Sequence, residues 1–150
     1  MQSIHFVEYD QTFLELSWLW LNDSEIKQMT NTPDFTRESQ QIWYNSLKNK
    51  INYKIWGITN NGIPIGACGL KNITSLDCEY WGYIGNKAYW GKGIGAGILK
   101  TMEEKAKTLH LVSIWLQVMK INERAIMLYL KNGYTLDISQ IDYIIMRKSL

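Results

Sequence analysis

The chain has 150 residues, of which 46% are hydrophobic and 20% are charged, and its formal net charge is +2. This length and balance predict one folded domain, residues 1–150, with a sizeable core. So small a charge, with no block of lysines or arginines, argues against nucleic acid or a membrane surface as a partner and favours a small molecule or a peptide.

The first fifty residues predict one strand followed by helices. Residues 4–9 alternate as a strand does, and residues 11–21 carry apolar side chains at helical spacing. Asp23 or Ser24 is suited to cap a short second helix, and Thr36 to open a third. The segment between those two helices contains a proline, so we expect it to be a loop.

From residue 52 the hydrophobic period changes to two, which predicts an antiparallel meander of three strands. Asn61 and Gly62 form a favoured hairpin turn before a strand at residues 63–72. A second turn, at residues 74–77, leads to a strand at residues 78–85.

The remainder alternates between helices and strands. A glycine-rich loop and a helix at residues 98–110 precede a strand at 111–119, a helix at 123–130 and a closing strand pair at 134–136 and 143–147. Strands followed by this alternation predict the α/β class, with a mixed sheet flanked by helices.

Two cysteines bear on metal binding and on the compartment. Cys68 and Cys78 form no Cys-x-x-Cys pair and have no histidine cluster near them, so we expect free buried thiols and no metal site. The sequence has no run of eighteen apolar residues and no basic-then-apolar leader pattern. We therefore expect a cytoplasmic protein.

Residues 89–97, Tyr-Trp-Gly-Lys-Gly-Ile-Gly-Ala-Gly, are the most informative segment. Alternating glycines let a backbone turn sharply and point several N–H groups at one spot, next to the positive end of a helix dipole. The segment therefore predicts a phosphate-binding loop. An ATP loop would need Ser or Thr after its lysine, and Lys92 has neither. A dinucleotide loop would need an acidic residue about twenty positions later, which is absent.

This loop, the strand end at residues 83–85 and the pattern Asn-x-x-Ala-x-x-Leu-Tyr-x-Lys-x-Gly-Tyr at 122–134 together resemble the GCN5-related N-acetyltransferase (GNAT) family. The branch it resembles contains ribosomal-protein and amino-sugar N-acetyltransferases. The resemblance implies a mostly antiparallel central sheet, splayed between two parallel strands and flanked by helices. It also implies that acetyl-CoA is the cosubstrate and that a primary amine attacks it directly.

The resemblance also assigns the cofactor-binding residues. Loop N–H groups would hold the pyrophosphate, the strand end would pair with the pantetheine arm, and Asn122 would contact the pantetheine region. Trp90 replaces the usual Gln or Arg, so the pyrophosphate contacts would come mainly from the main chain. The complete set is Tyr83, Ile84, Gly91, Lys92, Gly93, Gly95, Ala96, Asn122 and Tyr129.

Two residues are candidates for catalysis. Tyr129 lies where the family places the tyrosine that protonates the departing thiolate, although it also shares a helix face with Ala125 and Leu128, as a core aromatic would. Glu79, on the strand before the loop, is the candidate base, acting on the amine directly or through water. The alternative for Glu79 is an exposed strand residue.

Trp20, Asn22 and Trp81 are candidates for binding the acceptor, and the alternative for each tryptophan is a core position. Residues 18–23 resemble the Trp-x-Asn segment of GNAT members that acetylate nucleotide-linked amino sugars, although Leu21 replaces a frequent arginine. We therefore favour that acceptor. A peptide N-terminus, a polyamine or antibiotic, and a non-catalytic acyl-CoA sensor remain alternatives. The edge of the closing strand pair suggests a homodimer.

Overall fold

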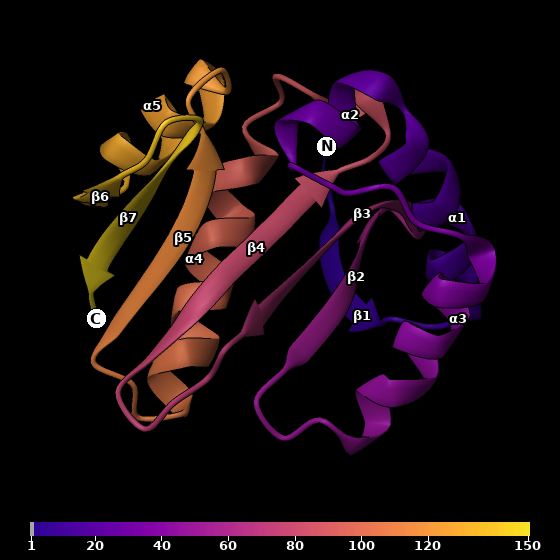
Figure 1. Cartoon of the computed structure of the whole chain (residues 1–150), viewed down its shortest axis with the longest axis horizontal. Coiled ribbons are helices and arrows are strands. Elements are labelled where there is room, and N and C mark those ends of the chain that lie inside the picture. The colour runs from indigo at the N-terminus through magenta and orange to yellow at the C-terminus, as the bar shows by residue number, and fades with distance from the viewer. Residues whose placement is uncertain (1) are drawn as a thin grey trace.

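A seven-stranded sheet in the order β1-β2-β3-β4-β5-β7-β6 runs through the computed structural model, which describes residues 2–150 (Figure 1). The strands are β1 Ile4–Glu8, β2 Lys54–Asn60, β3 Ile63–Lys71, β4 Asp77–Ile84, β5 Ser113–Met119, β6 Thr135–Ser139 and β7 Tyr143–Ser149. The helices are α1 Gln11–Asn22, α2 Ser24–Met29, α3 Arg37–Ser46, α4 Ile94–Thr108 and α5 Glu123–Lys131.

β4 and β5 form the parallel pair of this otherwise antiparallel sheet, and they pair over only part of their length. The pairing runs from Asp77 opposite Ser113 to Tyr80 opposite Leu116. Beyond it the two strands diverge, and Figure 1 shows the gap between their arrowheads. The predicted α/β class and the predicted splay between two parallel strands are both confirmed.

Capping side chains fix the starts of the first three helices. The Asp10 carboxylate accepts a hydrogen bond from Phe13 N–H, and the Asp23 carboxylate accepts one from Ile26 N–H. Thr36 and Ser39 form a reciprocal capping box at the start of α3. The cap predictions for Asp23 and Thr36 are therefore confirmed.

The predicted start of α4 was wrong. The helix begins at Ile94, four residues before the predicted position, so Gly95 and Gly97 lie in its first turn. Glycine disfavours helix interiors, but Ile94 and Ile98 are both buried and their packing outweighs that preference. Two further boundaries also differ, since β5 begins at Ser113 and β6 extends to Ser139.

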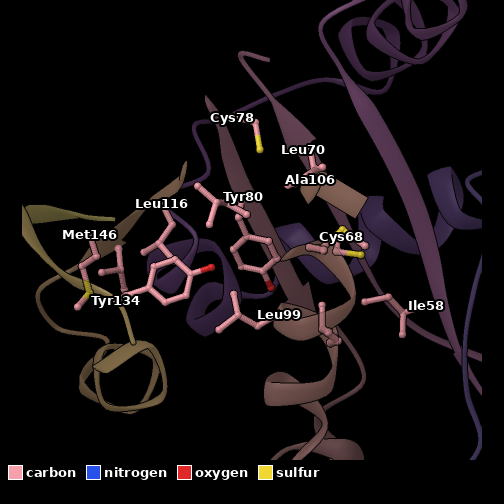
Figure 2. Close-up of a cluster of buried hydrophobic side chains, with 14 of the residues drawn as sticks. Ile58, Cys68, Leu70, Cys78, Tyr80, Leu99, Ala106, Leu116, Tyr134 and Met146 are labelled. Carbon is pink, nitrogen blue, oxygen red and sulfur yellow. The ribbon is translucent and has the colours of Figure 1, made fainter. Parts of the chain in front are cut away.

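The main core fills the space between the sheet and α4. Figure 2 shows Tyr80, Leu116, Tyr134 and Met146 converging there, with the hydroxyl of Tyr134 pointing inward. That hydroxyl donates to the Glu103 carboxylate at 2.9 Å. A second, smaller core lies on the opposite face, where α1 covers Ala67 of β3.

Both cysteines lie in the main core, as predicted. Cys68 and Cys78 are free and buried, and burial raises the pKa of each thiol to about 12. The thiols therefore stay protonated and weakly reactive near neutral pH. Residues 2–150 include no cluster of potential metal ligands. No helix in that range is long and apolar enough to cross a bilayer.

Candidate active site

The loop before α4 exposes unpaired main-chain donors. Gly91 has a φ of +73° and Gly93 a φ of +76°, values that strain any residue carrying a Cβ. Gly93 is the N-cap of α4, and no side chain caps the helix there. The first N–H groups of α4 are therefore open, at the positive end of the helix dipole, and this arrangement suits a phosphate.

Trp90 attaches this loop to the end of β4. Its indole N–H donates to the Ile84 carbonyl oxygen at 2.8 Å, which uses one of the two lone pairs of that oxygen. Lys87 Nζ lies 5.5 Å from the centroid of the Trp90 ring and also bridges Asp23 and Glu25, at 2.9 Å each. The tryptophan that departs from the family pattern thus fixes the loop against β4 and, through Lys87, against the start of α2.

A cavity of about 740 Å³ opens beside the loop, and we call it the cofactor cavity. Its walls come from the loop, the start of α4, the diverging end of β4, α2 and the start of α5. Eight of the nine predicted cofactor residues line it: Tyr83, Ile84, Gly91, Lys92, Gly93, Gly95, Ala96 and Asn122. The open donors and this cavity fit acetyl-CoA, whose pyrophosphate would lie against the α4 N–H groups.

Tyr129, the ninth, does not line the cavity but packs against a residue that does. Its ring makes an edge contact with the Tyr80 ring, with centroids 6.4 Å apart. Burial raises the pKa of Tyr129 to about 12, so the hydroxyl is a neutral donor at pH 7. Within residues 2–150 it has no hydrogen-bond partner. Its role as the proton donor stays a prediction.

Tyr80 lines the cofactor cavity and was missed from the sequence. It is the last residue of β4 that pairs with β5, so its side chain lies at the point of divergence. A Cβ at Gly82 would lie 2.4 Å from the Tyr80 hydroxyl oxygen, so the glycine makes room for this ring. Burial raises the pKa of Tyr80 well above its usual value.

A second cavity, of about 480 Å³, lies on the other side of β4 beneath α1 and α3, and we call it the acceptor cavity. The two cavities share Thr30, Gly82 and Tyr83 in their linings, so they meet where β4 leaves β5. One wall is a series of aromatic rings whose successive centroids are 5.9 to 6.4 Å apart. These rings belong to Tyr9, Trp43, Tyr53, Trp81 and Tyr83.

The three predicted acceptor-binding residues are separated in the structure. Trp81 lines the acceptor cavity. Trp20 packs over Gly85 and makes an edge contact with Tyr83 at 6.2 Å, outside both cavity linings. Asn22 is exposed and donates to the Trp18 carbonyl at 2.7 Å. Direct contact of Trp20 or Asn22 with an acceptor stays a prediction.

Glu79 is buried next to the acceptor cavity without lining it. One carboxylate oxygen accepts a hydrogen bond from Asn72 at 2.8 Å, and the other lies 3.8 Å from Lys71 Nζ. Alternation along β4 puts Glu79 on the same face as Trp81 and Tyr83, and Tyr80 on the opposite face. Its role as the base also stays a prediction.

Comparison with known proteins identifies the family. The family model described as the acetyltransferase (GNAT) family matches residues 15–134, which is most of the chain. A search of curated proteins finds no match to this sequence.

Solved structures share the fold at low sequence identity. A domain from Methanocaldococcus jannaschii is similar with a TM-score of 0.89 at 19% identity, covering 100% of both chains. Spermidine N-acetyltransferase from Vibrio cholerae, solved with CoA and spermine, has a TM-score of 0.84 at 17% identity, covering 99% of this chain and 95% of that one. Campylobacter jejuni N-acetyltransferase PseH, solved with acetyl coenzyme A, has a TM-score of 0.74 at 20% identity, covering 99% of both. The chain thus belongs to the GNAT family of N-acetyltransferases, and its cosubstrate is acetyl-CoA.

Proposed function

We propose that this enzyme acetylates a primary amine by direct attack, and that the amine is carried by a sugar linked to a nucleotide. Acetyl-CoA, when bound, supplies the activated acetyl thioester. The chain's own residues would hold the cosubstrate in the cofactor cavity and the amine in the acceptor cavity. Tyr83 lines both cavities, so it would lie beside the reacting groups.

The lining of the acceptor cavity is the observation that carries this choice of acceptor. Lys71 is the only charged residue among the described residues that line it. A polyamine would meet a lining that offers a lysine and no carboxylate, because Glu79 lies outside the lining and is paired with Lys71 and Asn72. The aromatic wall instead suits the flat face of a sugar or a base, and Lys71 suits a phosphate group.

We assign the proton transfers to the two residues suggested by the family pattern. Tyr129 would protonate the departing thiolate from its place behind Tyr80. Glu79 would accept the proton of the amine through water, because it lies next to Lys71 but outside the lining of the cavity. Neither role requires a covalent intermediate on the enzyme.

A panel of acceptors tests this proposal. The purified protein is incubated with acetyl-CoA and one of four amines: a UDP-linked amino sugar, free glucosamine, spermidine or a short peptide with a free N-terminus. CoA release is followed with a thiol reagent, and products are identified by mass spectrometry. We expect the highest kcat/KM with the UDP-linked sugar. Faster turnover of spermidine or the peptide would make that amine the acceptor in place of the sugar. Binding of acetyl-CoA without any turnover would favour the alternative of a non-catalytic sensor.

Two further expectations concern the context of the enzyme. We propose that it works in the cytoplasm, where its buried thiols would remain reduced. We also propose that it forms a homodimer through β6, an edge strand whose residues are all exposed. Sedimentation of the purified protein would test the dimer.

A further inference from the structure

Three hydroxyl groups from distant parts of the chain form one hydrogen-bonded series inside the acceptor cavity. Ser17 Oγ lies 2.7 Å from the Tyr9 hydroxyl and 2.9 Å from the Tyr83 hydroxyl. All three residues line the cavity. Ser17 is only 1% exposed, and Tyr9 is 7% exposed. We call these residues the hydroxyl chain.

The hydroxyl chain has one more hydrogen than it can use internally. Three hydroxyl groups carry three hydrogens, and the two contacts within the chain consume two of them. No other residue among 2–150 accepts a hydrogen bond from these groups. Burial raises the pKa of both tyrosines, that of Tyr9 to about 12, so none of the hydrogens is lost near neutral pH. One O–H therefore remains available to a molecule in the cavity.

An available donor in a buried cavity distinguishes between ligands. A ligand that offers an oxygen atom satisfies the O–H, whereas a hydrocarbon ligand removes it from water and leaves it unpaired. Sites built to bond a ligand hydroxyl discriminate strongly against the analogue without it, because the unpaired group is then trapped in the complex. The remaining lone pairs of the three hydroxyl oxygens can in turn accept hydrogen bonds from ligand hydroxyls.

The geometry points to the hydroxyl chain Tyr9–Ser17–Tyr83 as the element that selects amines bearing hydroxyl or ether oxygens over amines on plain hydrocarbon. This inference rests on the proposed function, because it places the acceptor in this cavity. Its substrate class is the polyhydroxylated amine. Ser17 acts by aligning the two tyrosine hydroxyls, so it is a positioning residue.

Two probe amines isolate this selection. Glucosamine and cyclohexylamine each carry one primary amine on a six-membered ring, and only glucosamine carries oxygen atoms. Their binding to the protein saturated with CoA is measured by calorimetry, which needs no turnover. We expect the wild type to prefer glucosamine by about tenfold or more, as one satisfied buried hydrogen bond allows.

Three variants locate the source of the preference. Ser17→Ala removes the central hydroxyl of the hydroxyl chain, and alanine is well tolerated inside a helix. Tyr83→Phe removes a single oxygen atom at one end of the hydroxyl chain. Both should lose most of the preference. The control is Tyr44→Phe. The Tyr44 ring lies 6.2 Å from the Tyr9 ring between centroids, but Tyr44 makes no hydrogen bond to the hydroxyl chain and does not line the cavity. It should keep the preference.

The inference fails if the wild type binds both amines equally, if Ser17→Ala and Tyr83→Phe keep the preference, or if Tyr44→Phe loses as much. Melting curves check that each variant is folded. If Ser17→Ala is not folded, the preference measured for Tyr83→Phe alone decides the outcome. The acetyltransfer assay separates this outcome from that of the proposed function. A preference in binding without CoA release upholds the hydroxyl chain and contradicts the transferase proposal, whereas CoA release without a preference contradicts the hydroxyl chain alone.

Discussion

The cofactor cavity and the acceptor cavity meet at Gly82 and Tyr83, but they are built from different parts of the chain. The cofactor cavity takes its central donors from the main chain of one continuous segment, residues 91–96. The acceptor cavity takes its hydrogen-bonding groups from side chains of α1, α3, β3 and β4 and from the segments that follow β1 and α2. Recognition by main-chain N–H groups requires glycine at fixed positions. Recognition by side chains can be built from many residue types, so almost any position in that cavity can change. The glycine segment therefore marks a family, and the second cavity is where we propose that the acceptor is selected.

The largest expected effect is on the chemical step. Tyr129→Phe should lower kcat about 100-fold or more, because a general acid contributes that much. The Kd of acetyl-CoA should not change, since the hydroxyl would act on the thiolate that forms only during the reaction and not on the bound thioester. Initial rates and calorimetry measure the two quantities. A pKa raised to about 12 keeps this hydroxyl protonated, so its donor role should persist from about pH 7 to about pH 10.

Tyr80→Phe provides the matched comparison, because Tyr80 is the other hydroxyl near the point of divergence and does line the cavity. A full loss of kcat in Tyr80→Phe together with normal turnover in Tyr129→Phe would transfer the donor role to Tyr80. It would also show that the family position of the tyrosine does not apply to this chain.

A side chain introduced into the glycine segment should weaken cofactor binding. A Cβ at Gly95 would lie 3.0 Å from Leu128 Cδ2, in the wall of the cavity, so Gly95→Leu should crowd the cosubstrate. We expect acetyl-CoA affinity to fall about 10- to 100-fold, the equivalent of an overpacking cost of about 1–3 kcal/mol. Gly97→Leu is the control, since nothing lies within 4 Å of a Cβ there. Equal losses in both variants would point to damage to the helix.

A charge reversal in the acceptor cavity should change the acceptor and leave the cosubstrate alone. Lys71→Glu should lower kcat/KM for a UDP-linked amino sugar about tenfold or more, the effect of losing one charge-assisted hydrogen bond. Lys71 also pairs with Glu79, the assigned base, so the readout is the ratio of kcat/KM for the UDP-linked sugar to that for spermidine, which should fall. Lys50→Glu is the control, because Lys50 lies over the Tyr53 ring but outside the cavity lining. If the order of acceptors were unchanged in Lys71→Glu, Lys71 would have no part in recognition of the acceptor.

The smallest expected effect concerns Asn122, which belongs to both the fold and the cofactor cavity. Its side chain caps α5 by accepting from Ala125 N–H, and it also lines the cavity. Asn122→Ala should lower the free energy of unfolding by about 1 kcal/mol, whereas Asn122→Asp should preserve the cap. Chemical denaturation measures this. If the amide also contacts the cosubstrate, both variants should weaken acetyl-CoA binding; normal binding in Asn122→Asp would leave it only the capping role.

Features that depend on near neighbours could be predicted from the sequence. Asp23 and Thr36 cap helices a few residues away, and the Asn61–Gly62 turn needs only the two positive φ values that these residues tolerate. The start of α4 could not be predicted in this way. Four glycines favour a loop locally, and only the burial of Ile94 and Ile98 in the folded protein extends the helix through the last two, Gly95 and Gly97.

The same distinction separates the two cavities. The glycine segment predicted five residues of the cofactor cavity, Gly91, Lys92, Gly93, Gly95 and Ala96, because the phosphate-binding pattern is contiguous, and the family resemblance supplied the other three. Ser17 could not be identified, because its partners lie 8 and 66 positions away and a serine inside a helix carries no local signal. Tyr80 was likewise indistinguishable from an ordinary strand aromatic until the divergence of β4 and β5 placed it in a cavity wall.

A crystal structure with CoA bound would show directly whether the main chain at the start of α4 holds the cosubstrate in a gap between diverging strands. We expect the pyrophosphate within hydrogen-bond distance of the N–H groups of Gly95 and Ala96, and the thiol end between β4 and β5 beyond Tyr80. CoA bound elsewhere on the protein, or no binding at millimolar concentration, would contradict this expectation.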